Sequence, residues 1–401
     1  MRLTRLSLEQ YRSYAAAELH PDPGLTIIAG PNGAGKTNLL EAIWVAVTGR
    51  SNRAAADHEL VRHGAPWARI RLDLSDEHLN PSRVELVVPG VEAGPEVRKR
   101  LLVNGLSRRP SSLTETVRAV LFRPEEMLLL VGPPSDRRRF LDGILTQSDR
   151  RAARDLVDLA RVVAQRNALL RAIRADEAQP AQLDFWDEQL VTIGSRLMAA
   201  RVAVVARLAE RIGALHAAVA AGDEGDEGAG EVRLEYLDSL RDAWPERASM
   251  AAAGELEGPF RTRLAEVRQK EIWNGSTLVG PHRDDLRVEL AGRDVASHAS
   301  RGQQRTIILA LKLAETELLA ADRNSADTGG ADETAQPVVL LDDVFSELDA
   351  ERAARALELL MQRGQVLVTM ADLSTLPKRH RHSVAVWQVD AGQLRLAPRV
   401  A

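Results

Sequence analysis

The feature that most constrains this chain is a glycine-rich loop between a short apolar run and an amphipathic stretch. Residues 25–29 are typical of a buried strand, and residues 39–47 carry apolar side chains at helical spacing. The loop between them matches the phosphate-binding P-loop pattern in full and consists of Gly30, Pro31, Asn32, Gly33, Ala34, Gly35, Lys36 and Thr37. We therefore expect an α/β fold with a nucleotide site where this strand passes into this helix.

The loop residues have separable roles in binding a nucleotide. Glycines let backbone N–H groups curl around phosphates, and the N-terminus of the helix adds its dipole. We expect Lys36 to reach the outer phosphates as a catalytic point charge, and Thr37 to offer its hydroxyl to Mg²⁺. Asn38, the next residue, is included among the nucleotide-binding residues. A glycine-rich turn without a ligand would not need a lysine and a threonine in this register.

A second motif is an apolar run, residues 337–341, that ends in Asp342 and Asp343. Such a run is typical of a buried parallel strand, and ligand sites lie at the carboxyl ends of such strands. Asp342 is the expected carboxylate for the Mg²⁺ site, and Asp343 stands where a general base for the attacking water would lie. Alone this pattern is weak evidence, but it is strong evidence beside the P-loop.

A third motif, residues 300–305, reads Ser-Arg-Gly-Gln-Gln-Arg and precedes a predicted helix over residues 306–320. Ser300 can cap that helix, and Gly302 allows a close backbone approach. With Gln303 they would form a second phosphate cradle. Since Lys36 already serves the chain's own nucleotide, the second cradle most simply serves a neighbouring copy, which implies a nucleotide-dependent homodimer. Taken by itself, the segment is equally well explained as an ordinary capped helix start.

Composition narrows the possible classes of protein. The chain has no cysteine, which excludes disulfides, thiolate metal sites and cysteine nucleophiles. It has no run of about 18 apolar residues and no apolar core of a signal peptide, so we expect a cytoplasmic protein without a membrane partner.

Charge and aromatic content bear on nucleic-acid binding. Because the net charge is -4, any DNA contact must come from local basic patches. Each patch can also be explained as a solvated surface without a binding function. The candidate patches are residues 98–100, 108–109, 137–139 and Arg379-His380-Arg381-His382. Aromatic residues make up only 3% of the chain, which argues against a platform that stacks single-stranded bases.

The rest of the pattern suggests how the chain is organised. Alternating runs over 67–74, 83–88 and 98–103, the last closing at Asn104-Gly105, predict an antiparallel meander. Residues 137–222 are mostly helical, and Pro180 separates two stretches that would form an antiparallel helical arm. We expect one part of a nucleotide-binding head over 1–132, an arm over 133–265 and the rest of the head over 266–401. Residues 222–230 and 324–336 have the composition of loops.

The order of these motifs, followed by Ser346-Glu347-Leu348-Asp349, resembles the ABC-type ATPases of the SMC and Rad-fifty group. Within that group, residues 8–14, 124–142 and 277–285 are similar to stretches of the RecF family, and the resemblance extends from the N-terminus to about residue 375. It implies an ABC/SMC-type P-loop ATPase head with an antiparallel β subdomain and an inserted, mostly helical arm. The arm is too short for a long coiled coil, and a zinc hook would need cysteines.

The resemblance also implies an activity and partners. Its members bind ATP and Mg²⁺, dimerise with ATP on duplex DNA or a single-strand/duplex junction, and are weak DNA-stimulated ATPases. They work with RecR and RecO and help to place RecA at single-strand gaps. Two departures point to slow turnover here. Asp343 replaces the glutamate common at the base position. The last predicted core strand, residues 365–369, runs directly into Met370-Ala371-Asp372, so no histidine stands at the usual switch position. The family's glutamine loop is not evident, although residues 122–125 could occupy its place.

Other functions remain open at this point. A nucleotide-switched DNA clamp with negligible hydrolysis would use the same motifs. A kinase-like P-loop enzyme would not need the segment at Ser300, and an ABC-type nuclease would need a cluster of metal ligands after Asp372. His282, beside Asp284 and Asp285, is interpreted as part of a structural or interface turn, because one histidine beside two aspartates rarely makes a complete metal site.

Overall fold

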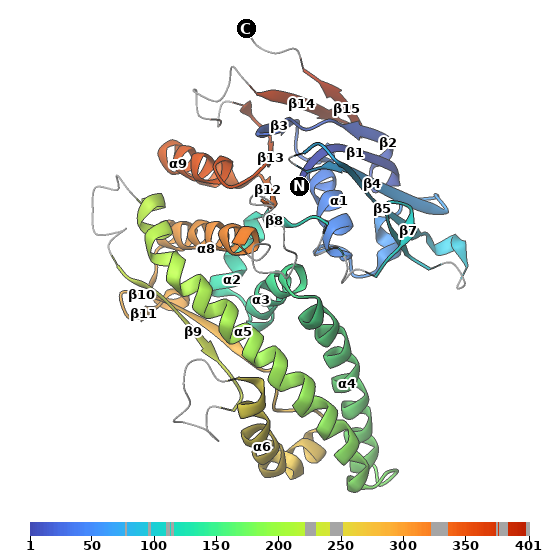
Figure 1. Ribbon diagram of the computed structural model, residues 1–401, viewed down its shortest axis with the longest axis vertical. Helices are drawn as coiled ribbons and strands as arrows, with labels where there is room; N and C mark the ends of the chain where they lie inside the picture. Colours follow the sequence, from blue (N-terminus) through green and yellow to red (C-terminus); the bar gives the residue numbers. More distant parts are fainter. Residues whose placement is uncertain are drawn as a thin grey trace. The chain divides into compact units, whose positions relative to one another are not determined.

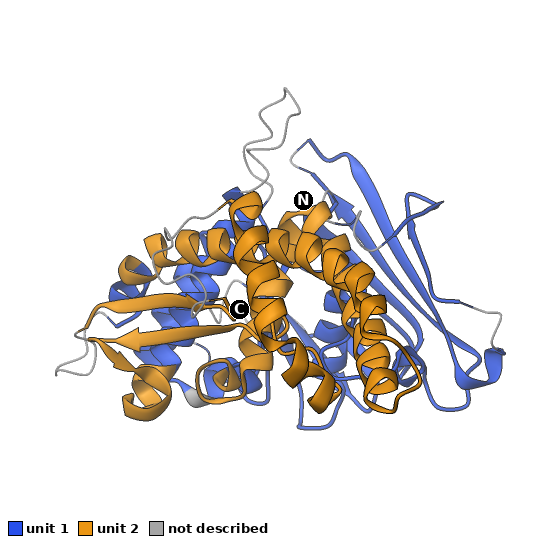
Figure 2. Ribbon diagram, turned by 90° about the horizontal axis from the view of Figure 1, so that it is seen from below, with its two compact units in different colours: residues 1–126, 215–224, 305–401 blue, residues 127–214, 225–304 orange. Residues whose placement is uncertain are grey.

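The computed structural model of the protein describes residues 1–76, 78–94, 98–109, 113, 116–220, 230–240, 252–321, 336–373, 376 and 384–397. The basic cluster at 379–382 lies outside these residues, as do almost all of the two predicted loops. The chain divides into two compact units, one of residues 1–126, 215–224 and 305–401, the other of residues 127–214 and 225–304 (Figure 2).

The first unit contains a largely parallel sheet with the strand order β15-β14-β3-β13-β12-β8 (Figure 1). All neighbouring strands are parallel except the edge pair β14 and β15. Its strands are β3 (Leu25–Ala29), β8 (Ala119–Phe122), β12 (Val338–Asp342), β13 (Val366–Met370), β14 (Ala385–Asp390) and β15 (Gln393–Leu396). Every residue of β3, β12 and β13 is buried, which explains why these strands are continuous apolar runs rather than alternating ones.

The first unit also contains an antiparallel sheet, in the order β2-β1-β4-β5-β6-β7. Its strands are β1 (Arg2–Tyr11), β2 (Tyr14–Leu19), β4 (Trp67–Ser75), β5 (Pro81–Pro89), β6 (Arg100–Val103) and β7 (Leu106–Ser107). The predicted meander is confirmed, and the turn after β6 has positive φ at Asn104 and Gly105, as a tight hairpin turn requires.

Helix α1 (Lys36–Thr48) joins the two sheets into one core. The core cluster holds Leu39, Ile43 and Val47 of this helix together with side chains from both sheets, such as Leu6 and Leu340. Two further helices belong wholly or mainly to this unit, α8 (Arg301–Ala321) and α9 (Ala350–Met361). Because α1 is buried on nearly all sides, the loop that precedes it is held by both sheets.

The second unit is mostly helical and contains a small sheet in the order β11-β10-β9. Its helices and strands are α2 (Leu128–Val131), α3 (Pro134–Ser148), α4 (Arg150–Arg174), most of α5 (Leu183–Ala220), β9 (Val232–Leu237), α6 (Ala253–Asn274), β10 (Asp285–Leu290), β11 (Arg293–Asp294) and α7 (Val295–His298). The pairs Arg196–Asp155 and Arg166–Asp187 join α5 to α4 in antiparallel order, as the sequence predicts for the arm.

The structure differs from the sequence expectations in two respects. The second unit consists of residues 127–214 and 225–304 rather than 133–265, because β10, β11 and α7 pack with the arm. The strand of residues 366–370 is not the last of the parallel sheet, because β14 pairs in parallel with β3 on its other side. The sheet order could not be foreseen, since the strands that pair are far apart in the sequence.

One helical segment among the described residues, Pro180–Ala220, is long and apolar enough to cross a membrane by length and composition alone. However, 56% of its most apolar window is buried inside the protein, and the core helix of a soluble protein passes the same test.

Candidate nucleotide site

The phosphate loop connects the buried strand β3 to α1. Gly30, Gly33 and Gly35 have φ values of 159°, 81° and 113°, and the last two lie in a region that L side chains rarely adopt. The Lys36 ammonium donates to the carbonyls of Gly30 at 2.7 Å and Pro31 at 3.0 Å. Burial lowers the pKa of Lys36, and the carboxylates of Asp343 and Asp342 oppose that shift. The lysine is therefore held across the loop near the two acidic residues.

The N-terminus of α1 lacks the usual side-chain cap within the described part of the chain. Its N-cap is Gly35, and its first turn contains no acidic residue. By contrast, Asp149 caps α4 and Asp349 caps α9 through their carboxylates. An uncapped helix N-terminus behind a glycine-rich loop is suited to bind an anionic phosphate.

Side chains from the β1–β2 turn and the start of β2 contact the phosphate loop. The Tyr14 hydroxyl donates to the Gly35 carbonyl at 3.0 Å, and the Asn38 amide donates to the Ser13 hydroxyl at 3.1 Å. Any side chain at position 35 would place its Cβ atom 2.8 Å from the Ser13 hydroxyl oxygen, a distance too short for a real Cβ contact. Only glycine therefore fits here. The stretch of residues 8–14 therefore has a physical role, because its Ser13 and Tyr14 fix the backbone of the phosphate loop.

A buried carboxylate next to this turn supports it. Arg12 donates to both carboxylate oxygens of Glu41, at 3.0 and 2.8 Å, and Ser51 donates to one of them at 2.6 Å. Burial raises the pKa of Glu41, but these hydrogen bonds outweigh it and hold the pKa below its usual value. The pair links the β1–β2 turn to the first helix.

Asp342 ends β12 beside the phosphate loop. The Thr37 hydroxyl donates to Asp342 Oδ1 at 3.0 Å, and the Thr369 hydroxyl donates to the same oxygen at 2.6 Å. Thr369 lies opposite Asp342 in the parallel register of β12 and β13. The two residues predicted to serve the metal are therefore brought together, and Thr369, which the sequence did not assign a role, orients the carboxylate.

The donor set around Asp342 fits Mg²⁺. This ion takes hard oxygen ligands, commonly one or two from the protein, and fills the remaining positions with water and phosphate. Thr37 and Asp342 supply a hydroxyl and a carboxylate oxygen 3.0 Å apart. Among the described residues, no group of three or more His, Cys, Asp or Glu side chains could hold a metal ion by itself.

Asp343 has an unusual backbone for a residue other than glycine. Its φ is 52°, and its N–H donates to the Thr369 hydroxyl at 3.0 Å. The Ser346 hydroxyl donates to its carbonyl at 2.8 Å. Aspartate and asparagine tolerate this left-handed region better than most side chains, and such outliers gather at functional sites. The turn after β12 is thus fixed by contacts on both sides of Asp343.

Ser300 caps α8 in the reciprocal arrangement of a capping box. The Gln303 N–H donates to the Ser300 hydroxyl at 3.2 Å, and the Ser300 N–H donates to the Gln303 side chain at 2.9 Å. Ser300 is exposed, and Gly302 and Gln303 are half-buried. The capped start expected from the sequence is present, and the serine faces solvent, where another molecule could reach it.

Two other predicted features have structural roles in the second unit. Arg137 forms an ion pair with Asp285 at 2.6 Å, and Arg138 donates to the Asp284 carbonyl at 2.7 Å, so these arginines brace α3 against β10. Of the cluster at 137–139, only Arg139 is exposed. Burial lowers the pKa of His282 to about 4 and outweighs the hydrogen bond to the Thr277 carbonyl, which would raise that pKa. A buried histidine of this kind agrees with the predicted structural turn.

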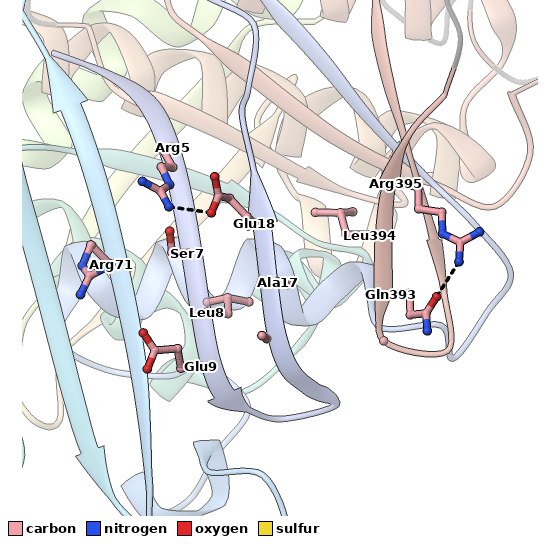
Figure 3. Close-up of a pocket in the computed structure, with 12 residues that line it drawn as sticks. Arg5, Ser7, Leu8, Glu9, Ala17, Glu18, Arg71, Gln393, Leu394 and Arg395 are labelled. Carbon is pink, nitrogen blue, oxygen red and sulfur yellow. Dashed lines mark hydrogen bonds and ion pairs between the residues drawn. The ribbon is translucent and has the colours of Figure 1, made fainter.

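A hollow of about 560 Å³ lies elsewhere in the first unit, between the outer face of β1 and β2 and the β14–β15 hairpin (Figure 3). Among its lining side chains, Arg5 pairs with Glu18 at 2.6 Å, and Arg395 donates to the neutral side chain of Gln393 at 2.9 Å. None of its lining residues belongs to the phosphate loop, so this hollow is not the nucleotide site.

The chain matches known proteins along almost its whole length. The family model described as "RecF/RecN/SMC N terminal domain" matches residues 2–393. A "DNA replication and repair protein RecF" of Chloroflexus aggregans is 35% identical over an alignment of 416 residues that covers 98% of this chain and 99% of that protein. One of the same description from Kineococcus radiotolerans is 38% identical over an alignment of 387 residues that covers 94% of each chain.

Solved structures agree with these matches. The structure described as "the recombination mediator protein RecF-ATPrS in RecFOR pathway" superposes with a TM-score of 0.84 at 25% identity and covers 99% of this chain and 98% of that one. The predicted ATPase-head fold with its antiparallel sheet and helical insertion is thereby confirmed. The chain belongs to the RecF family of DNA replication and repair proteins, within the larger RecF/RecN/SMC family.

Proposed function

We propose that this protein is an ATP- and DNA-binding mediator of recombinational repair, which dimerises with ATP and hydrolyses it slowly. The observation that carries the proposal is the contact of 3.0 Å between Thr37 and Asp342 at the end of a complete phosphate loop. A glycine-rich loop that does not bind a nucleotide would not need the Thr37 hydroxyl, at the start of a helix, to contact the buried carboxylate of Asp342. Related proteins solved with ATP or its analogue, at 25% identity, support the choice of nucleotide.

In this proposal the residues of the loop bind and orient the triphosphate. The uncapped N-terminus of α1 and the loop N–H groups receive the phosphate oxygens, and Lys36 exchanges its loop carbonyls for the outer phosphates. Thr37 and Asp342 would hold Mg²⁺, which neutralises charge that develops on the phosphates. Asp343 would accept the proton of the attacking water. Because its side chain is one methylene shorter than glutamate, we expect it to act inefficiently and turnover to be slow.

Thr369 is a positioning residue in this scheme, and Thr369→Val tests it. The variant keeps the shape of the buried site but removes the hydroxyl that orients Asp342 and receives the Asp343 N–H. Misplacement of about 1 Å can cost roughly 100-fold in rate, so we expect kcat to fall by 10- to 100-fold while the Kd for ATP changes little. Thr369→Ser should recover most of the rate. An equal loss in both variants, or no loss in either, would contradict the role.

Dimerisation is proposed to require Ser300. Its hydroxyl is exposed at the start of α8, and the chain's own phosphates are served by Lys36. Ser300→Arg should bind ATP within a few-fold of the unaltered protein but remain monomeric in light scattering with ATP. Ser297→Arg, an exposed change three residues upstream, should dimerise normally. A normal ATP-induced dimer of Ser300→Arg would exclude the cross-subunit cradle.

The DNA partner and the mediators are proposed from the relatives, whose names place them in DNA replication and repair and in the RecFOR pathway. We propose binding to duplex DNA or to a single-strand/duplex junction in the cytoplasm, with RecR- and RecO-type mediators and, indirectly, RecA. The deciding experiment is native mass measurement with ATP or ADP and a gapped duplex. ATP-specific dimers on DNA are expected, and the same complexes with ADP would refute the proposal. Undetectable turnover with and without DNA would favour a nucleotide-switched clamp.

A further inference from the structure

Helix α4 carries an unusual concentration of positive charge on its solvent-exposed side. Its exposed charged residues are six arginines and one aspartate, which gives +5 on one helix in a chain whose net charge is -4. They are Arg150, Arg151, Arg154, Asp158, Arg161, Arg171 and Arg174. We call the side of α4 that carries these residues its arginine face. A +5 helix on a net acidic chain requires a physical explanation.

The other long helices of the same unit do not share this feature. The exposed charged residues of α5 are Asp184, Glu188 and Glu210, which sum to -3, and those of α6 sum to zero. The arginines of α6 are paired with acids, including Arg261 with Glu188 at 2.8 Å and Arg268 with Asp184 at 2.7 Å. The excess is therefore a property of α4 and not of an arginine-rich composition alone.

Pairing within the protein does not account for the arginine face. Arg151, Arg154, Arg161 and Arg171 have no ion-pair partner among the residues that the structure describes. The charged residues on the inner side of α4 do have partners, since buried Arg166 pairs with Glu271 at 2.6 Å and Asp155 pairs with Arg196. The helix thus separates arginines that hold the fold from arginines directed to solvent.

Helix stability does not account for the arginine face either. Arg150, Arg151 and Arg154 stand in the first turns of α4, where the helix dipole disfavours cations, and the first turn holds no acid beyond the cap Asp149. Each such cation costs about 0.3–1 kcal/mol when it is exposed. Arg151 and Arg154 oppose the dipole and have no ion-pair partner among the described residues, so a ligand explains them more readily than folding does.

The dimensions and composition of the helix indicate which ligand. From Arg150 to Arg174 the helix rises about 36 Å, close to one turn of B-form DNA. Its sequence contains no aromatic residue that could stack on a base, so contact with bases of a single strand is disfavoured. Guanidinium groups bind phosphates well, and often through two parallel hydrogen bonds.

We propose that the arginine face of α4 binds the phosphate backbone of duplex DNA. This proposal rests on the proposed function, because it names the surface by which the protein holds its DNA. It assigns contact with DNA to the helical arm and not to the cluster at Arg137 and Arg138, whose guanidinium groups are engaged inside the unit. Binding through this surface depends on charge and not on base sequence.

The test removes three of the partnerless arginines together, as Arg151→Gln, Arg154→Gln and Arg161→Gln. Glutamine retains helix propensity and removes charge. Duplex binding is followed by fluorescence anisotropy with ATP over a range of salt concentrations. The slope of log K against log salt should fall by about 3, roughly one for each lost phosphate contact, and affinity should fall by on the order of 10- to 100-fold. Lysine at the three positions should restore most of the binding.

The matched control removes the same charge from the paired arginines of α6, as Arg261→Gln, Arg263→Gln and Arg268→Gln. It should leave the salt slope unchanged, and both triple variants should bind ATP like the unaltered protein. If the α4 triple variant keeps the original affinity and slope, the α4 assignment is wrong while the proposed function stands. Loss of mediator-protein binding with DNA affinity intact would overturn the assignment in favour of a protein-docking surface. Failure of the unaltered protein to bind duplex DNA would refute the proposed function itself.

Discussion

Lys36→Met is expected to abolish productive ATP binding and leave the fold intact. The Lys36 ammonium donates to the carbonyls of Gly30 and Pro31 at 2.7 and 3.0 Å, so it contributes charge to the loop rather than apolar packing. Methionine has a similar length and no charge, and it leaves the phosphates without their cation. Truncating one partner of a buried, hydrogen-bonded charge pair costs about 2–5 kcal/mol, which corresponds to roughly a 30-fold or larger increase in Kd.

Isothermal titration with ATP measures this effect, and thermal unfolding without nucleotide checks the fold. The matched control is Lys99→Met, because Lys99 is another lysine of the first unit, half-buried where Lys36 is buried, and pairs with Asp57 at 2.7 Å. That variant should bind ATP normally. If Lys36→Met binds ATP as tightly as the unaltered protein, the loop does not hold the triphosphate in the way proposed.

The local parts of the site could be predicted from the sequence because local rules determine them. A buried strand, three glycines and a following helix specify the phosphate loop without reference to the rest of the chain. The same holds for the apolar strand that ends at Asp342, and for the capped start of α8 at Ser300. Each of these features depends on residues that lie within a few positions of one another.

Contacts between distant parts of the chain could not be predicted in this way. Thr369 orients Asp342 only because β13 pairs with β12 in a parallel register that the sequence does not specify. Arg137 resembles a surface cation until its partner Asp285, 148 residues away, is known. The role of Tyr14 likewise depends on the turn after β1 packing behind Gly35. For the same reason, an arginine can be assigned to the surface of α4 only once its neighbours are known.

The point at which the chain returns from the second unit to the first was also beyond sequence reasoning. Helix α8 begins in the second unit at Arg301 and continues into the first from residue 305, so no break in composition marks the boundary. The buried Lys312 of this helix pairs with Glu126 at 3.2 Å and Glu315 at 3.0 Å. Glu126 is the last residue of the first unit before the chain enters the second. One buried charge cluster therefore anchors α8 in the first unit close to the point where the chain leaves it.

Asp343→Asn is expected to trap the ATP-bound dimer on DNA. Asparagine tolerates the left-handed backbone of this position, where φ is 52°, so the turn after β12 and its bond to Thr369 should persist. The substitution removes the carboxylate that would accept a proton from the attacking water. Loss of a general base costs about 100- to 10,000-fold in rate, while the contacts that bind the nucleotide remain.

The trapped state has a measurable signature that separates Asp343 from its neighbour. Asp343→Asn should retain the affinity for ATP, form the dimer and dissociate from duplex DNA far more slowly than the unaltered protein in a chase experiment. Asp342→Asn should instead weaken the dependence of ATP binding on Mg²⁺, because the oxygen lost there is the one that Thr37 and Thr369 contact. An Asp343→Asn protein that hydrolyses ATP and leaves DNA at the normal rate would show that another group activates the water. Fast basal turnover in the unaltered protein would equally contradict this role. The Asp343 side chain is short, and no histidine stands directly after the strand of residues 365–369, so hydrolysis is expected to be slow. Slow hydrolysis would make the lifetime of bound ATP set the time that the protein stays on DNA.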